Sequence, residues 1–123
     1  MTALSVPITS ITPHDERTER RALLEEQWRQ QIADITELAY EALTPVDEED
    51  EDGSRASELH VTTQLLAAAR QQLAETEAAL ARLDDGSYGL CVDCSNPISA
   101  ARLEILPAAR YCVACQATRS RRR

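Results

Sequence analysis

The chain has 123 residues, of which 43% are hydrophobic. It contains no Phe, one Trp and three Tyr, so few bulky side chains are available for a wide core. Its net charge of −8 argues against a protein that wraps a phosphate backbone over its whole surface. No run of 18 or more apolar residues is present, and residues 1–10 lack the basic start and apolar block of a secretory signal. We therefore expect a long or metal-stapled cytoplasmic domain with no membrane partner.

The charge is distributed unevenly along the chain. Residues 1–85 carry 7 Arg and 19 acidic residues, a balance of −12, whereas residues 86–123 carry 6 Arg and 2 acidic residues, a balance of +4. The two parts are expected to face different partners or surfaces.

A first helix is expected from Thr12 to about Leu43, after a flexible arm formed by residues 1–11. Thr12 is a typical N-cap and Pro13 fits the first helical position. Pro45 ends the helix because proline cannot continue the hydrogen-bond ladder and disfavours helical geometry in the residue before it. The apolar residues share one stripe because they recur at steps of three and four: Leu24, Trp28, Ile32, Ile35, Ala39 and Ala42.

A second helix is expected after an acidic loop at residues 44–53. Ser54 is the expected N-cap of this helix, with Ser57 as a competing start. Gly86 is expected to end it in a left-handed conformation. Apolar and Thr residues at alternating steps of three and four predict a coiled-coil seam: Leu59, Thr62, Leu66, Ala69, Leu73, Thr76, Leu80 and Leu83.

Both helices have about 30 residues, or roughly 45 Å at 1.5 Å per residue, and a short loop joins them. The predicted fold is mostly α: a long antiparallel coiled-coil hairpin over residues 12–85 with the acidic loop at its tip. A small C-terminal four-cysteine zinc finger follows at 86–116, and a basic tail at 117–123. We expect a monomer; the alternative is a dimer in which each long helix pairs with its copy in a second chain.

All four cysteines lie in the finger, as Cys91-x-x-Cys94 and Cys112-x-x-Cys115 with 17 residues between the pairs. This spacing is typical of one tetrahedral zinc site, and four thiolates leave no open position for a substrate, so we expect one structural zinc ion. Two disulfides are the alternative in an oxidising compartment. A thioredoxin-like redox role lacks the βαβ pattern that it needs.

Between the pairs, Asn96 or Ser99 can cap a short helix that Pro107 stops. Ile98, Leu103 and Ile105 give this unit apolar surface to pack against the base of the hairpin. Arg102 is expected to bridge to a hairpin carboxylate or to a partner. Because metal binding and folding are coupled in such units, removal of zinc is expected to melt residues 88–116 first.

The stretch at 86–116 combines its metal ligands with a specific set of flanking residues: Gly86, Ser87, Tyr88, Gly89, Leu90, Ile98, Arg102, Leu103, Glu104, Pro107 and Ala109. This combination resembles the zinc-finger signature of the DksA/TraR family, bacterial regulators that bind RNA polymerase. The hairpin is similar in architecture to the longer family members. Ser95 stands where the family usually has Gly, a substitution that is expected to strain the turn because Gly tolerates positive φ better.

The resemblance implies a factor that inserts its coiled coil into the secondary channel of RNA polymerase and modulates initiation without catalysing a reaction or reading DNA sequence. It also implies guanosine tetraphosphate, the alarmone of the stringent response, as a ligand at the interface. The tip residues implied to act near the catalytic centre are Asp47, Glu48, Glu49, Asp50, Glu51 and Asp52. The family's usual tip pattern has no clean match here, and a solvated loop is the alternative interpretation of this acidic run.

The basic tail is a second candidate contact with polymerase or nucleic acid, and a solvated chain end is its alternative. Its residues are Arg119, Arg121, Arg122 and Arg123. A different class of function is also open: a small zinc-ribbon module that binds nucleic acid or acts as an adaptor, with the hairpin serving only for dimerisation or docking.

Overall fold

The computed structural model describes residues 13–43 and 53–122. Within these ranges the helices are α1 (Pro13–Leu43), α2 (Ser54–Asp85), α3 (Ala100–Ile105) and α4 (Val113–Arg121). The described residues form no strand beyond an isolated bridge between Leu90 and Pro97. The predicted fold class, a mostly α chain with a helical hairpin and a small four-cysteine unit, is confirmed.

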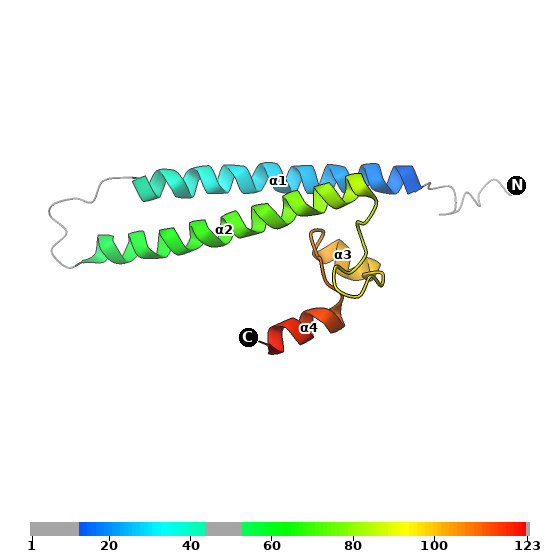
Figure 1. Cartoon of the computed structure of the whole chain (residues 1–123). Helices are drawn as coiled ribbons and strands as arrows, with labels where there is room; N and C mark the ends of the chain where they lie inside the picture. Colours follow the sequence, from blue (N-terminus) through cyan, green and yellow to red (C-terminus); the bar gives the residue numbers. More distant parts are fainter. Residues whose placement is uncertain (1–12, 44–52, 123) are drawn as a thin grey trace, which may run out of the picture.

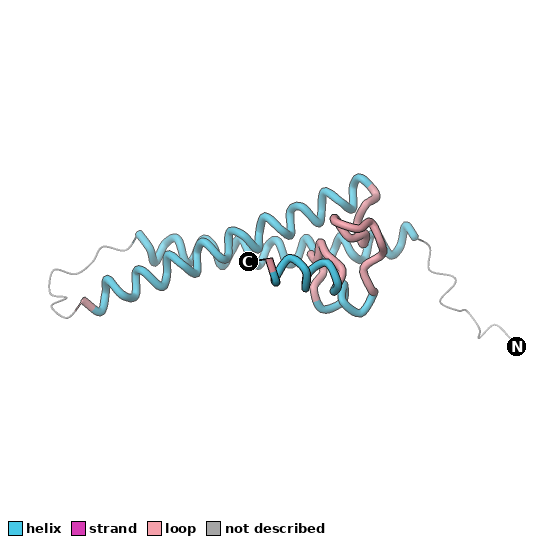
Figure 2. The backbone as a smooth tube through the Cα atoms, turned by 60° about the horizontal axis from the view of Figure 1, so that its bottom comes forward, coloured by secondary structure: helices cyan, strands magenta, loops and turns pink. Residues whose placement is uncertain are grey.

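Helices α1 and α2 lie side by side and run in opposite directions (Figure 1). The small unit that contains α3 and α4 lies beside the end of the hairpin at which α2 ends, and Figure 2 shows the same arrangement from another side. We call this end the base of the hairpin. No helix in the described ranges carries an 18-residue stretch apolar enough to cross a bilayer.

The first described residue of α1 is a proline. Pro13 opens the helix, where its fixed φ suits the first turn and its missing N–H leaves no bond unmade. Within the described residues the helix extends to Leu43. Thr44 and Pro45, the pair that was expected to stop it, lie outside the described residues. The predicted cap, Thr12, lies outside the described residues.

The prediction for the start of α2 was wrong. The N-cap is Gly53, with φ of 76°, and not Ser54 or Ser57. Instead the Ser57 N–H donates to the Gly53 carbonyl at 3.1 Å. The chain enters the helix through a left-handed residue, a conformation that costs glycine little. At the other end Gly86 has φ of 85° and its N–H donates to the Arg82 carbonyl, as predicted.

The predicted seam of α2 is confirmed, because every one of its eight positions is buried or half-buried. The stripe of α1 agrees less well. Ile32 remains 36% exposed, whereas Gln31 and Leu38 are half-buried. The face that α1 turns toward α2 is therefore more polar in its middle than the apolar period alone indicates.

A polar contact occupies part of this interface. Thr76 is fully buried, and its Oγ1 accepts a hydrogen bond from Gln27 Nε2 at 3.0 Å while donating to the Gln72 carbonyl at 3.2 Å. One turn of α1 away from Leu24, the half-buried Trp28 donates its indole N–H to Glu77 at 3.1 Å. These bonds satisfy groups that would be costly to bury alone.

The best-packed part of the hairpin is its base. Leu24, Ala79 and Leu83 form a buried cluster against which Leu80, Tyr88 and Ala108 pack. Arginines of α1 add polar links at the same end: Arg17 donates to the Leu83 carbonyl at 2.8 Å, Arg20 donates to the Leu103 carbonyl at 3.4 Å, and Arg21 forms an ion pair with Asp84. The hairpin therefore presents a firmly packed end to the cysteine-containing unit.

Candidate metal centre

The first cysteine pair lies in a tight turn that we call the first knuckle, residues 91–95. The Cys91 N–H donates to the Asn96 carbonyl at 2.8 Å, and the Ser95 N–H donates to the Cys91 carbonyl at 2.9 Å. Ser95 has φ of 64°, the single positive value for a non-glycine residue in residues 13–43 and 53–122. The strain expected from the sequence at this position is therefore present.

The second pair lies at the start of α4. Cys112 is the N-cap of this helix, and its Sγ accepts a hydrogen bond from the Cys115 N–H at 3.5 Å. The Gln116 N–H donates to the Cys112 carbonyl at 2.9 Å. The N-terminal end of a helix carries partial positive charge, which suits it to hold the thiolate ligands of a bound metal ion.

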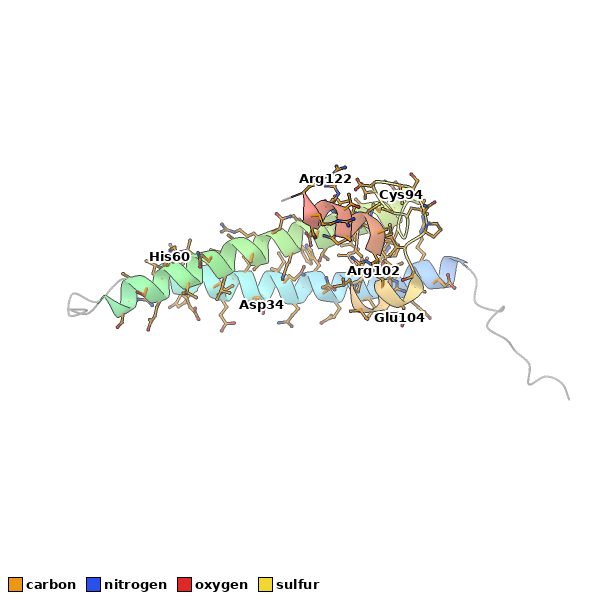
Figure 3. The ribbon with its side chains drawn as sticks, turned by 90° about the horizontal axis from the view of Figure 1, so that it is seen from below. Asp34, His60, Cys94, Arg102, Glu104 and Arg122 are labelled. Carbon is orange, nitrogen blue, oxygen red and sulfur yellow. The ribbon has the colours of Figure 1, made fainter. Side chains whose placement is uncertain are left out.

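The fold brings the two pairs together. The four sulfur atoms all lie within 4.8 Å of one another, and the Sγ atoms of Cys94 and Cys112 are 3.8 Å apart. A zinc ion with Zn–S bonds of about 2.3 Å in tetrahedral geometry requires S–S separations of about 3.8 Å, so the donor set fits this ion. Figure 3 shows Cys94 at the base of the hairpin, far from the exposed His60 on the tip-side half of α2.

The thiols differ in acidity. Burial acts to raise the pKa of Cys91, but hydrogen bonds from the backbone N–H groups of Cys112, Cys94 and Asp93 outweigh it and lower that pKa to about 6. Hydrogen bonds with the side chains of Cys112 and Cys91, together with burial, raise the pKa of Cys115 to about 12. A bound dication favours the thiolate form of every ligand, so metal binding here is linked to proton release.

A small apolar core supports the cluster. Cys91, Ile98 and Leu103 are buried together, and Tyr88 and Tyr111 are among the residues packed on them. Helix α3 supplies Leu103, and its N-cap is Ser99, one of the two caps that the sequence offered; the Ser99 Oγ accepts from the Arg102 N–H at 3.2 Å. Ile105 of the same helix was expected to pack as well, but it is 78% exposed. The core gives the metal-binding turns a fixed support.

Of the two roles expected for Arg102, the bridge to a hairpin carboxylate is not formed within the described residues. Its Nε donates instead to the Tyr111 carbonyl at 3.0 Å, within the same small unit, and the contact with a partner stays a prediction. Arg102 therefore braces the backbone directly before Cys112.

The finger is joined to the base of the hairpin through Tyr88, which packs on the core of each. The Tyr88 hydroxyl donates to the Pro107 carbonyl at 2.7 Å, and burial raises its pKa, which keeps the hydroxyl protonated for this bond. Arg82 of α2 adds a bond of 3.4 Å to the Ala109 carbonyl. From the sequence, Tyr88 was assigned only to the family signature, and its contact with both the finger and the hairpin was not predicted.

The remaining predicted site residues have different outcomes. The acidic tip residues 47–52 and Arg123 lie outside the described residues. Arg119 and Arg121 belong to α4, which continues past the predicted finger boundary at residue 116. Arg121 is exposed and donates to Thr118 Oγ1 at 3.5 Å, and Arg122 is the exposed C-cap. Arg119 instead contacts Asp93 in the first knuckle, a partner that the sequence analysis missed.

The fold and the site together define a helical hairpin that carries a structural C4-type zinc finger. Residues 86–121 match the family model described as the prokaryotic dksA/traR C4-type zinc finger. Residues 86–121 are therefore a zinc finger of the DksA/TraR type, and the family match and the clustered thiols support one structural zinc ion.

Individual relatives agree with this assignment. The chain is 42% identical over 53 residues to the RNA polymerase-binding transcription factor DksA of two strains of Caulobacter vibrioides, a match that covers 43% of this chain. The match spans 37% of the length of these curated relatives.

Solved structures extend the likeness over the hairpin. Transcription factor DksA2 from Pseudomonas aeruginosa is similar with a TM-score of 0.79 at 28% identity, over 95% of this chain and 92% of that protein. The DnaK suppressor protein from Agrobacterium tumefaciens C58 is similar with a TM-score of 0.55 at 27% identity, over 82% of this chain and 91% of that protein.

Proposed function

We propose that this protein is a transcription regulator that binds bacterial RNA polymerase in the cytoplasm and modulates initiation without being an enzyme. The observation that carries the proposal is the similarity to DksA2 over 95% of the chain, hairpin and finger together. The names of the curated relatives, RNA polymerase-binding transcription factors, supply the partner. A closed four-thiolate site supports a structural role for the metal.

The hairpin is proposed to enter the secondary channel of the polymerase. Helices of 31 and 32 residues extend for roughly 45–50 Å at 1.5 Å per residue, and the pair is only two helices wide. The finger is attached at the base, so the opposite end is free to lead into a channel (Figure 1). We propose that the acidic residues 47–52 there act on a metal ion or on basic groups near the catalytic centre, since carboxylates are preferred ligands of hard cations.

A monomer is proposed as the active form. The seam of α2 is covered by α1 of the same chain, so the hairpin buries its seam without a second copy. Guanosine tetraphosphate, bound where the protein meets the polymerase, is proposed as a modulator, and sequence-specific DNA recognition is not part of the proposal.

The test is a pull-down with core RNA polymerase followed by transcription in vitro on a stable-RNA promoter, with and without guanosine tetraphosphate. Replacement of residues 47–52 by Ser and Gly is expected to abolish the effect on transcription and to leave part of the binding. Asp34→Asn, which neutralises an exposed acid on the shaft of the hairpin, is the control and is expected to change neither. Unchanged activity of the tip variant would refute the role of the tip.

A nucleic-acid-binding zinc ribbon is the second candidate, and the net charge of +4 at 86–123 favours it. The two candidates give opposite results in the same assays. Failure to bind core polymerase, together with binding to bare DNA at physiological salt, would support the ribbon and exclude the regulator.

A further inference from the structure

The first knuckle and helix α4 are connected by an ion pair that lies next to the metal ligands. Arg119 Nε is 2.7 Å from Asp93 Oδ2, and Arg119 Nη2 is 2.8 Å from Asp93 Oδ1. The contact is therefore bidentate, which is the geometry in which an arginine–carboxylate pair is strongest and most directional. The two residues are 26 positions apart in the sequence.

The guanidinium of Arg119 is also stacked. It lies 4.3 Å from the centre of the Tyr111 ring, within the range of a cation–π contact. Tyr111 is held in turn by its neighbours, since its carbonyl accepts from Arg102 Nε at 3.0 Å and its hydroxyl accepts from Arg110 Nη2 at 3.2 Å. The Arg119 side chain is thereby fixed on two sides.

The ion pair joins the same two segments that the metal joins. Asp93 lies between Cys91 and Cys94 in the first knuckle. Arg119 follows Cys115 by four residues on α4, and residues four apart lie on one face of a helix. We propose that Asp93 and Arg119 are positioning residues that form a latch, which holds the first knuckle against α4 so that zinc is retained in the finger.

The latch acts alongside a backbone bond of 2.8 Å from the Val92 N–H to the Arg110 carbonyl. The side chains of Arg119 and Asp93 are 48% and 34% exposed, so solvent weakens the ion pair. Bidentate geometry and the stacked ring offset part of that loss. Loss of both contacts is expected to speed zinc release about 3- to 30-fold, the range that an exposed ion pair and a cation–π contact supply together.

The experiment measures the rate at which zinc passes from the full-length protein to an excess of a chromophoric chelator. Arg119→Ala removes both contacts and is expected to speed release about 3- to 30-fold, whereas Asp93→Asn leaves the stack on Tyr111 and is expected to speed release about 1.5- to 5-fold. The double variant is expected to release zinc no faster than the faster single variant. Arg119→Lys keeps the charge but not the bidentate contact, so an intermediate rate is expected. Arg121→Ala removes the same charge from the same helix without touching Asp93 and is expected to match the parent protein.

Asp93→Asn separates the latch from a general effect of charge. A zinc ion with four thiolates is an anionic centre, so through charge alone the loss of the Asp93 carboxylate would slow zinc release, whereas the loss of the latch speeds it. Slower or unchanged release from Asp93→Asn would overturn the proposal. So would an effect of Arg119→Ala no larger than that of Arg121→Ala. Because the readout is zinc retention, its result does not depend on the proposed binding to polymerase.

Discussion

Ser95 offers a direct test of how backbone strain limits the metal centre. Its φ of 64° places a residue with a Cβ atom in the left-handed region, at a cost of about 1–2 kcal/mol relative to the right-handed conformation. Ser95→Gly removes this cost, but the greater freedom of glycine in the unfolded chain returns about 0.5–1 kcal/mol of it. The net gain in stability is expected to be about 0.5–1 kcal/mol.

Because folding of the finger and metal binding are coupled, this gain is expected as tighter zinc binding. A free-energy gain of about 0.5–1 kcal/mol corresponds to an apparent Kd about 2- to 5-fold lower. The assay is a competition for zinc between the full-length protein and a chromophoric chelator of known affinity, supported by thermal unfolding of the zinc-loaded protein.

Two controls isolate the effect of the backbone. Ser95→Ala keeps the Cβ atom and removes only the hydroxyl, so no gain is expected. Ser120→Gly makes the same chemical change at an exposed helical position of α4, where glycine is expected to destabilise by about 0.5 kcal/mol. The reasoning is refuted when Ser95→Gly weakens zinc binding, or when Ser95→Ala tightens it equally.

Three further predictions concern packing and metal removal. Leu24 is fully buried at the base of the hairpin, and Leu24→Ala is expected to lower the free energy of unfolding in urea by about 2–4 kcal/mol. Its neighbour Leu23 is 55% exposed, so Leu23→Ala is expected to cost less than about 1 kcal/mol, and equal costs would contradict the described core. Thr76→Val leaves the Gln27 amide without its acceptor and is expected to lower the free energy of unfolding by about 1–2 kcal/mol. In the double variant Gln27→Leu is expected to restore much of this stability, and additive losses from the two substitutions would count against the pair. Removal of zinc is expected to expose the amides of residues 88–116 to hydrogen exchange before those of the hairpin base, and uniform loss of protection would contradict this order.

Patterns that are local in the chain predicted much of the fold. The seam of α2 followed from its alternating steps of three and four, and all of its positions are covered in the structure. Gly86 ends α2 as expected, and Ser99 caps α3. The cap of α2 was missed because Gly53 replaces a side-chain bond by a left-handed backbone, which a search for polar caps does not detect.

The stripe of α1 shows where a local pattern is insufficient. Apolar spacing placed Ile32 in the interface with α2, but Ile32 is 36% exposed and its neighbour Gln31 is half-buried. The same side of α1 carries Gln27, which donates a hydrogen bond to Thr76 of α2. Which side of a helix is covered depends on its partner as well as on its own period, and a buried polar pair is satisfied only by residues on the other helix.

By itself the sequence determined the metal ligands, the two long helices and the hairpin order, because ligand spacing, helical period and proline or glycine at a helix end act over a few neighbouring residues. Only the tertiary structure decided how the finger is attached and braced. Tyr88 joins two cores, and Arg119 reaches Asp93 across 26 positions. Such contacts form between segments that the fold alone brings together, so no local pattern in the chain specifies them.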